Sequence, residues 1–242
     1  MLLMILIIGH IIADFYLQSS NMAENKQKST RVLMVHSGIY LLVFAIIDFV
    51  FMHPQIAIWT TLIIASAHLF IDLIRIKIDN NFKNYKVSFL TFIIDQILHL
   101  ATIIVTYYSL NLSININSVY SNCESYSNFN KIVMYGLLFV FLLEPVAVLV
   151  KKTFAFLFKE ETNNNSRNNV GSTIGKLERF ITSILLLCNQ YGVIGLVLTA
   201  KSIARFKQLE ERDFAEKYLV GTLLSLAISL ISTTVVKNIL SI

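Results

Sequence analysis

Charged side chains are scarce in this chain. Asp, Glu, Lys and Arg together make up 14% of its 242 residues, whereas apolar residues make up 55%. Soluble domains carry about 25% charged residues, so this composition excludes an ordinary soluble globular protein. The length is better counted in membrane spans of about 20 apolar residues each.

Proline, glycine and cysteine are also few, with two, eight and two residues respectively. Because so few residues interrupt helices or strands, the chain is neither loop-rich nor of low complexity. The two cysteines, Cys123 in a polar stretch and Cys188 in an apolar run, provide neither a disulfide framework nor a thiolate metal site. The chain also has no motif for a nucleotide cofactor.

The formal net charge of +5 does not indicate nucleic-acid binding, because the basic residues lie in short segments between apolar runs. That arrangement is typical of the cytoplasmic loops of a membrane protein. Residues 18–33, 75–87 and 151–174 are basic, whereas 52–55 and 110–130 hold neither Lys nor Arg. The positive-inside rule then predicts an N-terminus outside the cell and three basic loops in the cytoplasm.

Seven apolar runs are long enough for helices rather than strands. They cover residues 2–17, 34–51, 56–75, 88–109, 131–150, 175–199 and 218–240. We therefore predict an all-α fold, a polytopic transmembrane helix bundle of about six to seven membrane helices. Residues 1–242 are expected to form a single integral membrane domain, with a four-helix core at 1–110 and further membrane helices at 131–242.

The run at 175–199 departs from this pattern because basic residues flank it on both sides, and the polar stretch 189–192 (Asn-Gln-Tyr-Gly) interrupts it. A re-entrant or broken helix is one interpretation, since irregular backbone at membrane depth needs cover from protein or water. A single crossing with a basic external loop is the other. Residues 200–217 are rich in both charges and are expected to form an amphipathic surface helix in the cytoplasm.

Histidine and aspartate are concentrated in the first four predicted spans. Three pairs stand four residues apart, a spacing that places both side chains on one face of a helix. The pairs are His10 and Asp14, His68 and Asp72, and Asp95 and His99. At about 1.5 Å per helical residue, these pairs, His36 and Glu144 all fall in the cytoplasmic half of the bilayer. They can therefore converge on one polar pocket open to the cytoplasm.

Ionisable groups at such depth are candidates for a functional site, because a charge there costs about 2.5–3.5 kcal/mol. Imidazole and carboxylate are usual ligands of zinc, manganese or iron, so we predict a site for one of these divalent metals. The candidate ligands are His10, Asp14, His68, Asp72, Asp95 and His99. The candidate catalytic residues are Asp14, Asp72, Asp95 and His36. Metal-bound water would be the nucleophile of a hydrolytic reaction.

Three other interpretations compete with a metal enzyme. The His/Asp pairs can be hydrogen-bonded contacts between helices, or the site of a proton or metal-ion transporter. Transport needs a polar path to the other face, and the outer halves of the first four spans hold few polar residues apart from Asp48, expected at the outer interface. The third alternative is a non-catalytic membrane scaffold that binds a partner through its loops.

Lys201 and Arg205 stand four residues apart just after the run at 175–199. Basic side chains at the cytoplasmic face can hold a phosphate, such as a lipid headgroup. Topology anchors and ion pairs beside the membrane use the same residue types, so both interpretations stay open.

The order of these motifs resembles a bacterial integral-membrane family known only as domain of unknown function 3307. The resemblance covers about the first 110 residues, and its motifs are 10–18 (His-Ile-Ile-Ala-Asp-Phe-Tyr-Leu-Gln), Met22-Ala23 with Lys26, His36, 68–72 (His-Leu-Phe-Ile-Asp) and 95–99 (Asp-Gln-Ile-Leu-His). Later motifs similar to the C-terminal part of such proteins are 174–179 (Ile-Gly-Lys-Leu-Glu-Arg), Gln190, Ala200-Lys201-Ser202 with Arg205, and Gly221-Thr222. The resemblance implies a location in the bacterial cytoplasmic (inner) membrane and carries no established activity.

More distantly, the intramembrane His/Asp helices are similar to bacterial inner-membrane metal-dependent hydrolases. We therefore predict a membrane-embedded, metal-dependent hydrolase that acts on a lipid or another membrane-associated substrate. Its expected partners are membrane lipids and no nucleic acid, and the sequence names no protein partner.

Overall fold

The computed structural model describes residues 1–82, 84–159 and 166–241, and the side chains of 166–169 lie outside this description. Every regular element within these ranges is helical, apart from an isolated antiparallel bridge between Met52 and Ile116. The predicted all-α fold is therefore confirmed. Part of the basic loop predicted at 151–174 falls outside the described residues.

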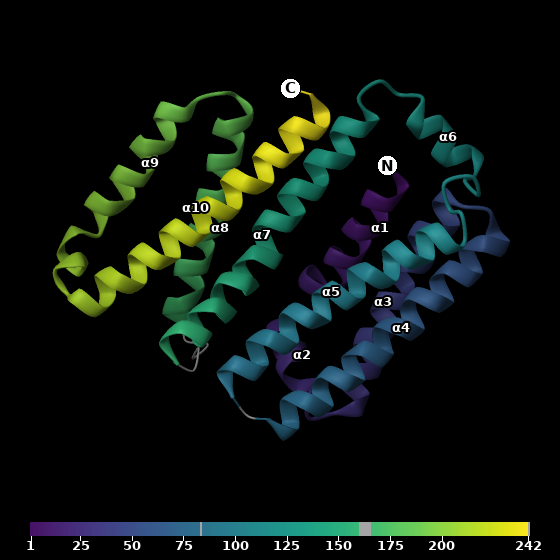
Figure 1. The fold of residues 1–242 in the computed structure, drawn as a ribbon, viewed down its shortest axis with the longest axis horizontal. Helices are drawn as coiled ribbons and strands as arrows, with labels where there is room; N and C mark the ends of the chain where they lie inside the picture. Colours follow the sequence, from purple (N-terminus) through teal and green to yellow (C-terminus); the bar gives the residue numbers. More distant parts are fainter. Residues whose placement is uncertain (83, 160–165, 242) are drawn as a thin grey trace. The chain divides into compact units, whose positions relative to one another are not determined.

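Two compact units make up the chain, Met1–Val140 and Phe141–Ile242, and the division falls inside the long helix α7 (Phe129–Phe158). Figure 1 shows the elements in chain order. Before α7, the first unit holds α1 (Leu2–Ile11), the π-helical turn η1 (Ile12–Tyr16), α2 (Ser20–Asn25), α3 (Thr30–Phe51), α4 (Pro54–Asn81), α5 (Tyr85–Ser109) and α6 (Ser118–Glu124).

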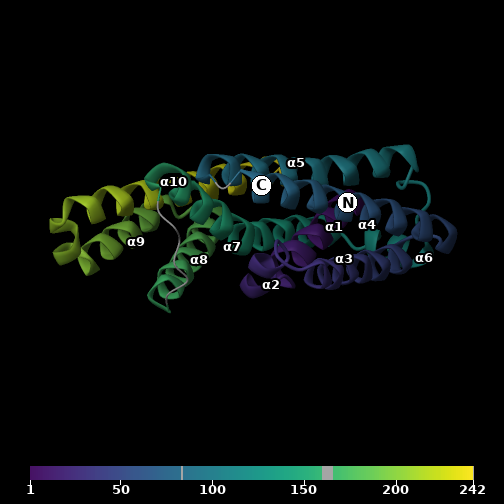
Figure 2. The same cartoon turned by 90° about the horizontal axis from the view of Figure 1, so that it is seen from below.

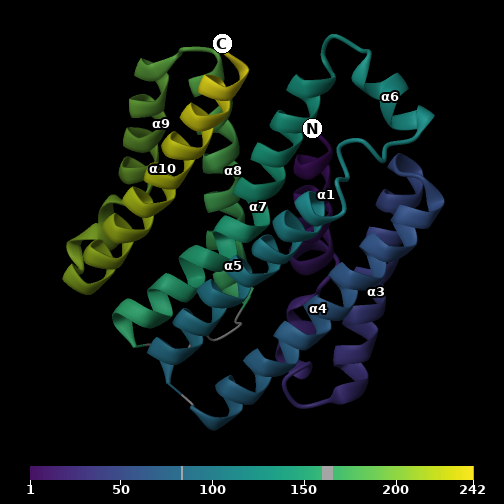
Figure 3. The ribbon, with the colours of Figure 1, turned by 45° about the vertical axis from the view of Figure 1, so that its right-hand side comes forward.

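Helices α1, α3, α4 and α5 form the body of the first unit. Short connections reverse the chain after Phe51 and Asn81, so α3 packs against α4 and α4 against α5. Figure 3 shows α3 and α4 side by side. Helix α1 lies between α3 and α5 and contacts both (Figure 2). Each of the four helices therefore turns one face toward a shared interior.

In the described part of the chain, five helices are long and apolar enough to cross a membrane: α3, α4, α5, α7 and α10 (Arg212–Leu240). Two shorter apolar segments, Leu2–Tyr16 and α9 (Tyr191–Ala204), bring the set to the size predicted. No more than 39% of the most apolar window of any long helix is buried within the protein. Apolar surface of this extent requires a lipid environment, so the chain is a membrane protein.

Apolar side chains fill the first unit on the side of the α3–α4 turn. Leu6, Phe44, Ile64 and Ile103 come one from each helix of the bundle, and each is at most 1% exposed. The segment before α6 covers this end, where the Asn117 amide donates a hydrogen bond of 2.8 Å to the backbone of α3. This end of the bundle is therefore closed by apolar packing and a hydrogen-bonded loop.

Asp48 lies inside the bundle, and its predicted depth near the outer interface stays a prediction. It is fully buried, and the Thr61 hydroxyl of α4 donates to its Oδ2 at 2.7 Å. The reason is its register on α3, where His36, Tyr40 and Phe44 precede it at intervals of four residues on the buried face. A polar residue in that register faces α4 whatever its depth.

In the second unit, α8 (Ser166–Leu187) and α9 form an antiparallel hairpin, and α10 packs against α8 (Figure 1). Asn189 lies in the turn with a φ of 60°, a left-handed conformation in which asparagine is enriched. Lys201 of α9 donates to Glu178 of α8 at 2.7 Å, which joins the two arms. The broken helix predicted near 175–199 is therefore confirmed.

The single surface helix expected at 200–217 is wrong. Helix α9 continues to Ala204, a 3₁₀ turn η2 covers Phe206–Glu210, and α10 begins at Arg212. Two apolar helices reverse direction here, and the charged residues are shared between the connection and the adjoining ends of the two helices. A highly charged composition suits an exposed turn as well as a surface helix, so composition alone did not distinguish the two.

The Asp48–Thr61 hydrogen bond should contribute to the stability of the α3–α4 pair. The replacement Thr61→Val keeps the shape of the side chain but removes the hydroxyl that donates to Asp48 Oδ2. Leaving a buried polar atom such as this oxygen unpaired costs about 1–3 kcal/mol. We expect the thermal midpoint in detergent to fall by several degrees. The control Thr199→Val changes an exposed threonine that bonds only to its own helix and should leave the midpoint nearly unchanged. Equal midpoints for both variants would contradict the assigned role of Thr61.

Candidate metal centre

Aspartate and histidine side chains from all four helical segments of the first bundle meet in its interior. Asp14 comes from η1, His36 from α3, His68 from α4, and Asp95 and His99 from α5. Asp14 is 8% exposed and the other four at most 2%. Residues four apart share one face of a helix, which is why the spacing seen in the sequence leads to a common interior site.

Asp14 lies in a π-helical turn, in which the Leu17 N–H donates to the Ile12 carbonyl at 3.0 Å. A π turn contains one residue more than an α turn, and such turns are frequent at functional sites. The turn coincides with the point where the chain leaves the bundle, and both His10 and Asp14 remain buried. Nothing in the residue pattern predicted this turn.

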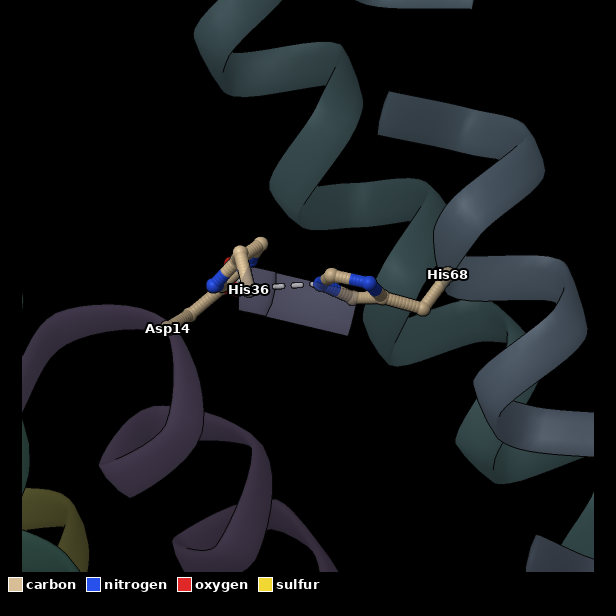
Figure 4. A group of neighbouring side chains, drawn as sticks. All are labelled: Asp14, His36 and His68. Carbon is tan, nitrogen blue, oxygen red and sulfur yellow. Dashed lines mark hydrogen bonds and ion pairs between the residues drawn. The ribbon is translucent and has the colours of Figure 1, made fainter. Parts of the chain in front are cut away.

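The first group of ligand atoms belongs to Asp14, His36 and His68, which lie within 4.8 Å of one another (Figure 4). Asp14 Oδ1 is 3.0 Å from His68 Nε2 and 3.2 Å from His36 Nε2. Bonds of about 2.0–2.1 Å to a tetrahedral zinc ion place its ligand atoms about 3.3 Å apart. Asp72 Oδ2 borders the group at 3.5 Å from His36 Nε2. These separations are those of ligands arranged around one cation.

The second group belongs to Asp14, Asp95 and His99, whose ligand atoms also lie within 4.8 Å of one another. His99 Nδ1 donates to the backbone carbonyl of Asp95 at 2.8 Å, which leaves Nε2 as the nitrogen with the free lone pair. A carbonyl on the other ring nitrogen is a common way to orient a metal-binding histidine. His99 therefore presents the correct nitrogen for a metal.

Several buried atoms of this cluster have no hydrogen-bond partner among the described residues. They are His36 Nδ1 and Nε2, His68 Nδ1, His99 Nε2 and Asp95 Oδ1. An unpaired buried polar atom costs about 1–3 kcal/mol, and folded proteins pair nearly all of them. Their concentration in one place indicates a site suited to a bound ligand.

His10, predicted as a metal ligand, engages both ring nitrogens in hydrogen bonds. The Tyr40 hydroxyl donates to Nδ1 at 3.2 Å, and Nε2 donates to Gln96 Oε1 at 3.3 Å. The Gln96 amide nitrogen then donates to Asp95 Oδ2 at 3.1 Å and to Asp14 Oδ2 at 3.4 Å. In this arrangement His10 orients Gln96, and Gln96 joins the two carboxylates.

Two side-chain cations hold the outlying carboxylates of the cluster. Lys26 Nζ donates to both oxygens of Asp72, at 3.1 and 3.0 Å. Arg75 Nη1 donates to Asp95 Oδ2 at 2.8 Å. Asp72 and Asp95 therefore have countercharges. Asp14, within the described part of the chain, faces imidazoles and an amide instead.

Four residues of this site had no role assigned to them from the sequence. They are Tyr40, Gln96, Lys26 and Arg75. Helical spacing offered a signal for Arg75, three residues after Asp72, and Gln96 adjoins Asp95 in the sequence. For Lys26 the only signal was its place in a motif of the family resemblance, because the packing of α2 beside α3 brings its ammonium group to the interior.

Lys201, Arg205 and Glu144 lie in the second unit and have partners there. Lys201 forms an ion pair with Glu178 at 2.7 Å, and the Arg205 guanidinium lies 5.7 Å from the centre of the Tyr218 ring. Glu144 accepts a hydrogen bond from a lysine of α8. The structure thus describes Lys201 as a member of an ion pair between helices, one of the two alternatives raised by the sequence.

The buried Lys26–Asp72 pair should be strongly coupled. In the variant Lys26→Met the Asp72 carboxylate loses its countercharge, and breaking a buried ion pair in this way costs about 3–5 kcal/mol. We expect a large fall in the thermal midpoint in detergent, and partial recovery when Asp72→Asn is added. Lys28→Met, at an exposed position, is the matched control. If the fall in thermal midpoint of the double variant equals the sum of the falls of the two single variants, the two side chains do not depend on each other.

Comparison with known proteins places the chain in a family without assigning it a reaction. The family described as "Protein of unknown function (DUF3307)" matches residues 2–127, more than half of the chain and the whole of the His/Asp cluster. No curated protein and no solved structure matches the chain. The resemblance noted in the sequence is therefore confirmed, and the protein belongs to the DUF3307 family.

Proposed function

We propose that this protein is a membrane-embedded, metal-dependent hydrolase that acts on a lipid or another membrane-associated substrate. The observation that carries the proposal is the meeting of buried imidazole and carboxylate ligand atoms in the first bundle, several of them without a hydrogen-bond partner among the described residues. Such a donor set selects zinc, manganese or iron.

A bound metal would supply a water molecule that is a nucleophile near neutral pH. Asp14, His36 and His68 would hold the metal. Asp95 Oδ1 is a buried carboxylate oxygen without a partner in the described structure, and it is suited either to accept a hydrogen bond from that water or to bind a metal itself. Arg75 fixes the other oxygen of Asp95, so the accepting oxygen keeps its direction.

Hydrogen-bonded contact between helices accounts less well for this arrangement. Polar contacts within membranes stabilise by satisfying their donors and acceptors. Thr61 satisfies only one oxygen of Asp48, but the bonds from Lys26 to both oxygens of Asp72 follow that rule. His36 and His99 do not, because each has a buried ring nitrogen that no described residue satisfies. A bound cation removes this cost.

Transport also fits less well than hydrolysis. An ion crossing the membrane needs polar groups along its whole path. On the side of the α3–α4 turn, Phe44, Ile64 and Ile103 close the bundle interior and are at most 1% exposed. Asp48 lies beyond them and is already bonded to Thr61. A hydrolase needs access from one side only, so a closed end does not count against it.

A membrane-associated substrate follows from the position of the site inside helices that are long and apolar enough to cross the bilayer. Lys26 and Arg75, which border the cluster, belong to or adjoin the basic segments 18–33 and 75–87. Basic segments face the cytoplasm in bacterial inner-membrane proteins. We therefore place the open side of the site at the cytoplasmic face, with the N-terminus outside the cell.

Metal content tests the proposed function. After supply of zinc, manganese or iron, detergent-purified wild type should retain near-stoichiometric metal by elemental analysis, and His68→Ala should lose most of it. His53→Ala, an exposed histidine at the start of α4, is the matched control and should retain it. The metal-loaded protein should hydrolyse a member of a panel of lipid phosphates and esters, and chelation should stop the reaction. A folded wild type that binds no metal would overturn the proposal.

The proposed orientation has its own test. Cys123 lies in the segment 110–130, which we place outside the cell. In the variant Cys188→Ser, a maleimide that cannot cross membranes should label Cys123 in intact spheroplasts as fully as after lysis. Labelling that appears only after lysis would reverse the orientation.

A further inference from the structure

The two groups of ligand atoms share one residue, Asp14. Its Oδ1 lies beside the imidazoles of the first group, 3.0 Å from His68 and 3.2 Å from His36. Its Oδ2 accepts from the Gln96 amide, which also bonds to Asp95 in the second group. One oxygen of Asp14 therefore lies among the ligands of the first group, and the Gln96 amide links the other oxygen to Asp95 of the second group.

We propose that the site binds two divalent cations bridged by the Asp14 carboxylate. One cation is held by Asp14, His36 and His68, and the other by Asp14, Asp95 and His99. This inference rests on the proposed metal centre and adds its stoichiometry and the division of its ligands.

The unpartnered atoms are divided between the two groups of ligands. A single cation in the first group satisfies His36 Nε2 but leaves His99 Nε2 and Asp95 Oδ1 buried without partners. These two atoms belong to the second group, and the Nδ1–H of His99 is already committed to a carbonyl at 2.8 Å. The second cation satisfies both atoms at once.

The spacing of the two groups also fits a pair of cations. Metals in two-metal hydrolases lie about 3.5–4 Å apart, a distance that the two oxygens of one carboxylate can bridge. The His68 ring of the first group and the His99 ring of the second lie side by side, with centroids 4.4 Å apart. Ligands from both groups are therefore close enough to serve neighbouring metals.

The charge of the cluster also favours two bound cations. Its carboxylates are Asp14, Asp72 and Asp95, and its side-chain cations are Lys26 and Arg75. With neutral histidines the carboxylates are in excess, which favours binding of divalent cations. Two such cations more than balance that excess, and the remaining positive charge suits a bridging hydroxide and an anionic group of the substrate, as in two-metal hydrolysis.

Manganese provides the probe, because its amount and its magnetic coupling can both be measured. The full chain in detergent is loaded with Mn²⁺ and freed of excess metal, and bound manganese per chain is determined by elemental analysis. We expect two ions per chain in wild type and in the His53→Ala control. We expect one in His36→Ala and one in His99→Ala, which remove a ligand from the first or the second group only. Asp14→Ala, which changes the shared ligand, should retain less than one.

Electron paramagnetic resonance of the loaded wild type gives a second readout that needs no variant. Two ions bridged by a carboxylate should give an exchange-coupled spectrum, distinct from the six-line signal of isolated Mn²⁺. One ion per wild-type chain, with an uncoupled signal and no loss in folded His99→Ala, would overturn the two-cation site and leave the proposed hydrolase standing. No bound manganese, zinc or iron in folded wild type would overturn both.

Discussion

The interior of a helix bundle in a membrane contains little water, so each polar atom placed there needs a partner in the protein or in a bound ligand. The first unit of this protein meets that requirement for most of its buried polar side chains. Lys26 satisfies Asp72, Thr61 satisfies one oxygen of Asp48, and Gln96 links His10 to two carboxylates. Half of the unsatisfied atoms that remain among the described residues are imidazole nitrogens of the cluster around Asp14, and the functional account depends on them.

The architecture serves to bring those atoms together. Each helix of the bundle carries its polar residues on the same stripe as its buried apolar residues, so packing of Phe44 or Ile103 also positions His36 or His99. The π turn at 12–16 contains Asp14, and the apolar end near the α3–α4 turn prevents the polar interior from extending through the bundle. The first unit therefore combines a closed end with a polar interior that borders two basic segments.

Much of the fold was predictable because its signals are local. Apolar runs and the four-residue spacing of His and Asp report helix positions and helix faces directly. Contacts that depend on how helices pack were not predictable in the same way. The contact of Lys26 with Asp72 joins residues far apart in the sequence, and nothing in the residue pattern predicted the π turn at Asp14. Of the candidate ligands, His10 has both nitrogens bonded, a detail that no spacing rule conveys.

The central claim is that imidazole and carboxylate of the first bundle coordinate a metal directly. X-ray absorption at the K-edge of the metal retained by the purified protein tests this claim most directly. We expect a shell of nitrogen and oxygen at about 2.0–2.2 Å, with the outer-shell scattering of imidazole rings. That imidazole scattering should diminish in His68→Ala and stay unchanged in His53→Ala. A shell of water oxygens alone, or a spectrum that His68→Ala does not alter, would contradict the account.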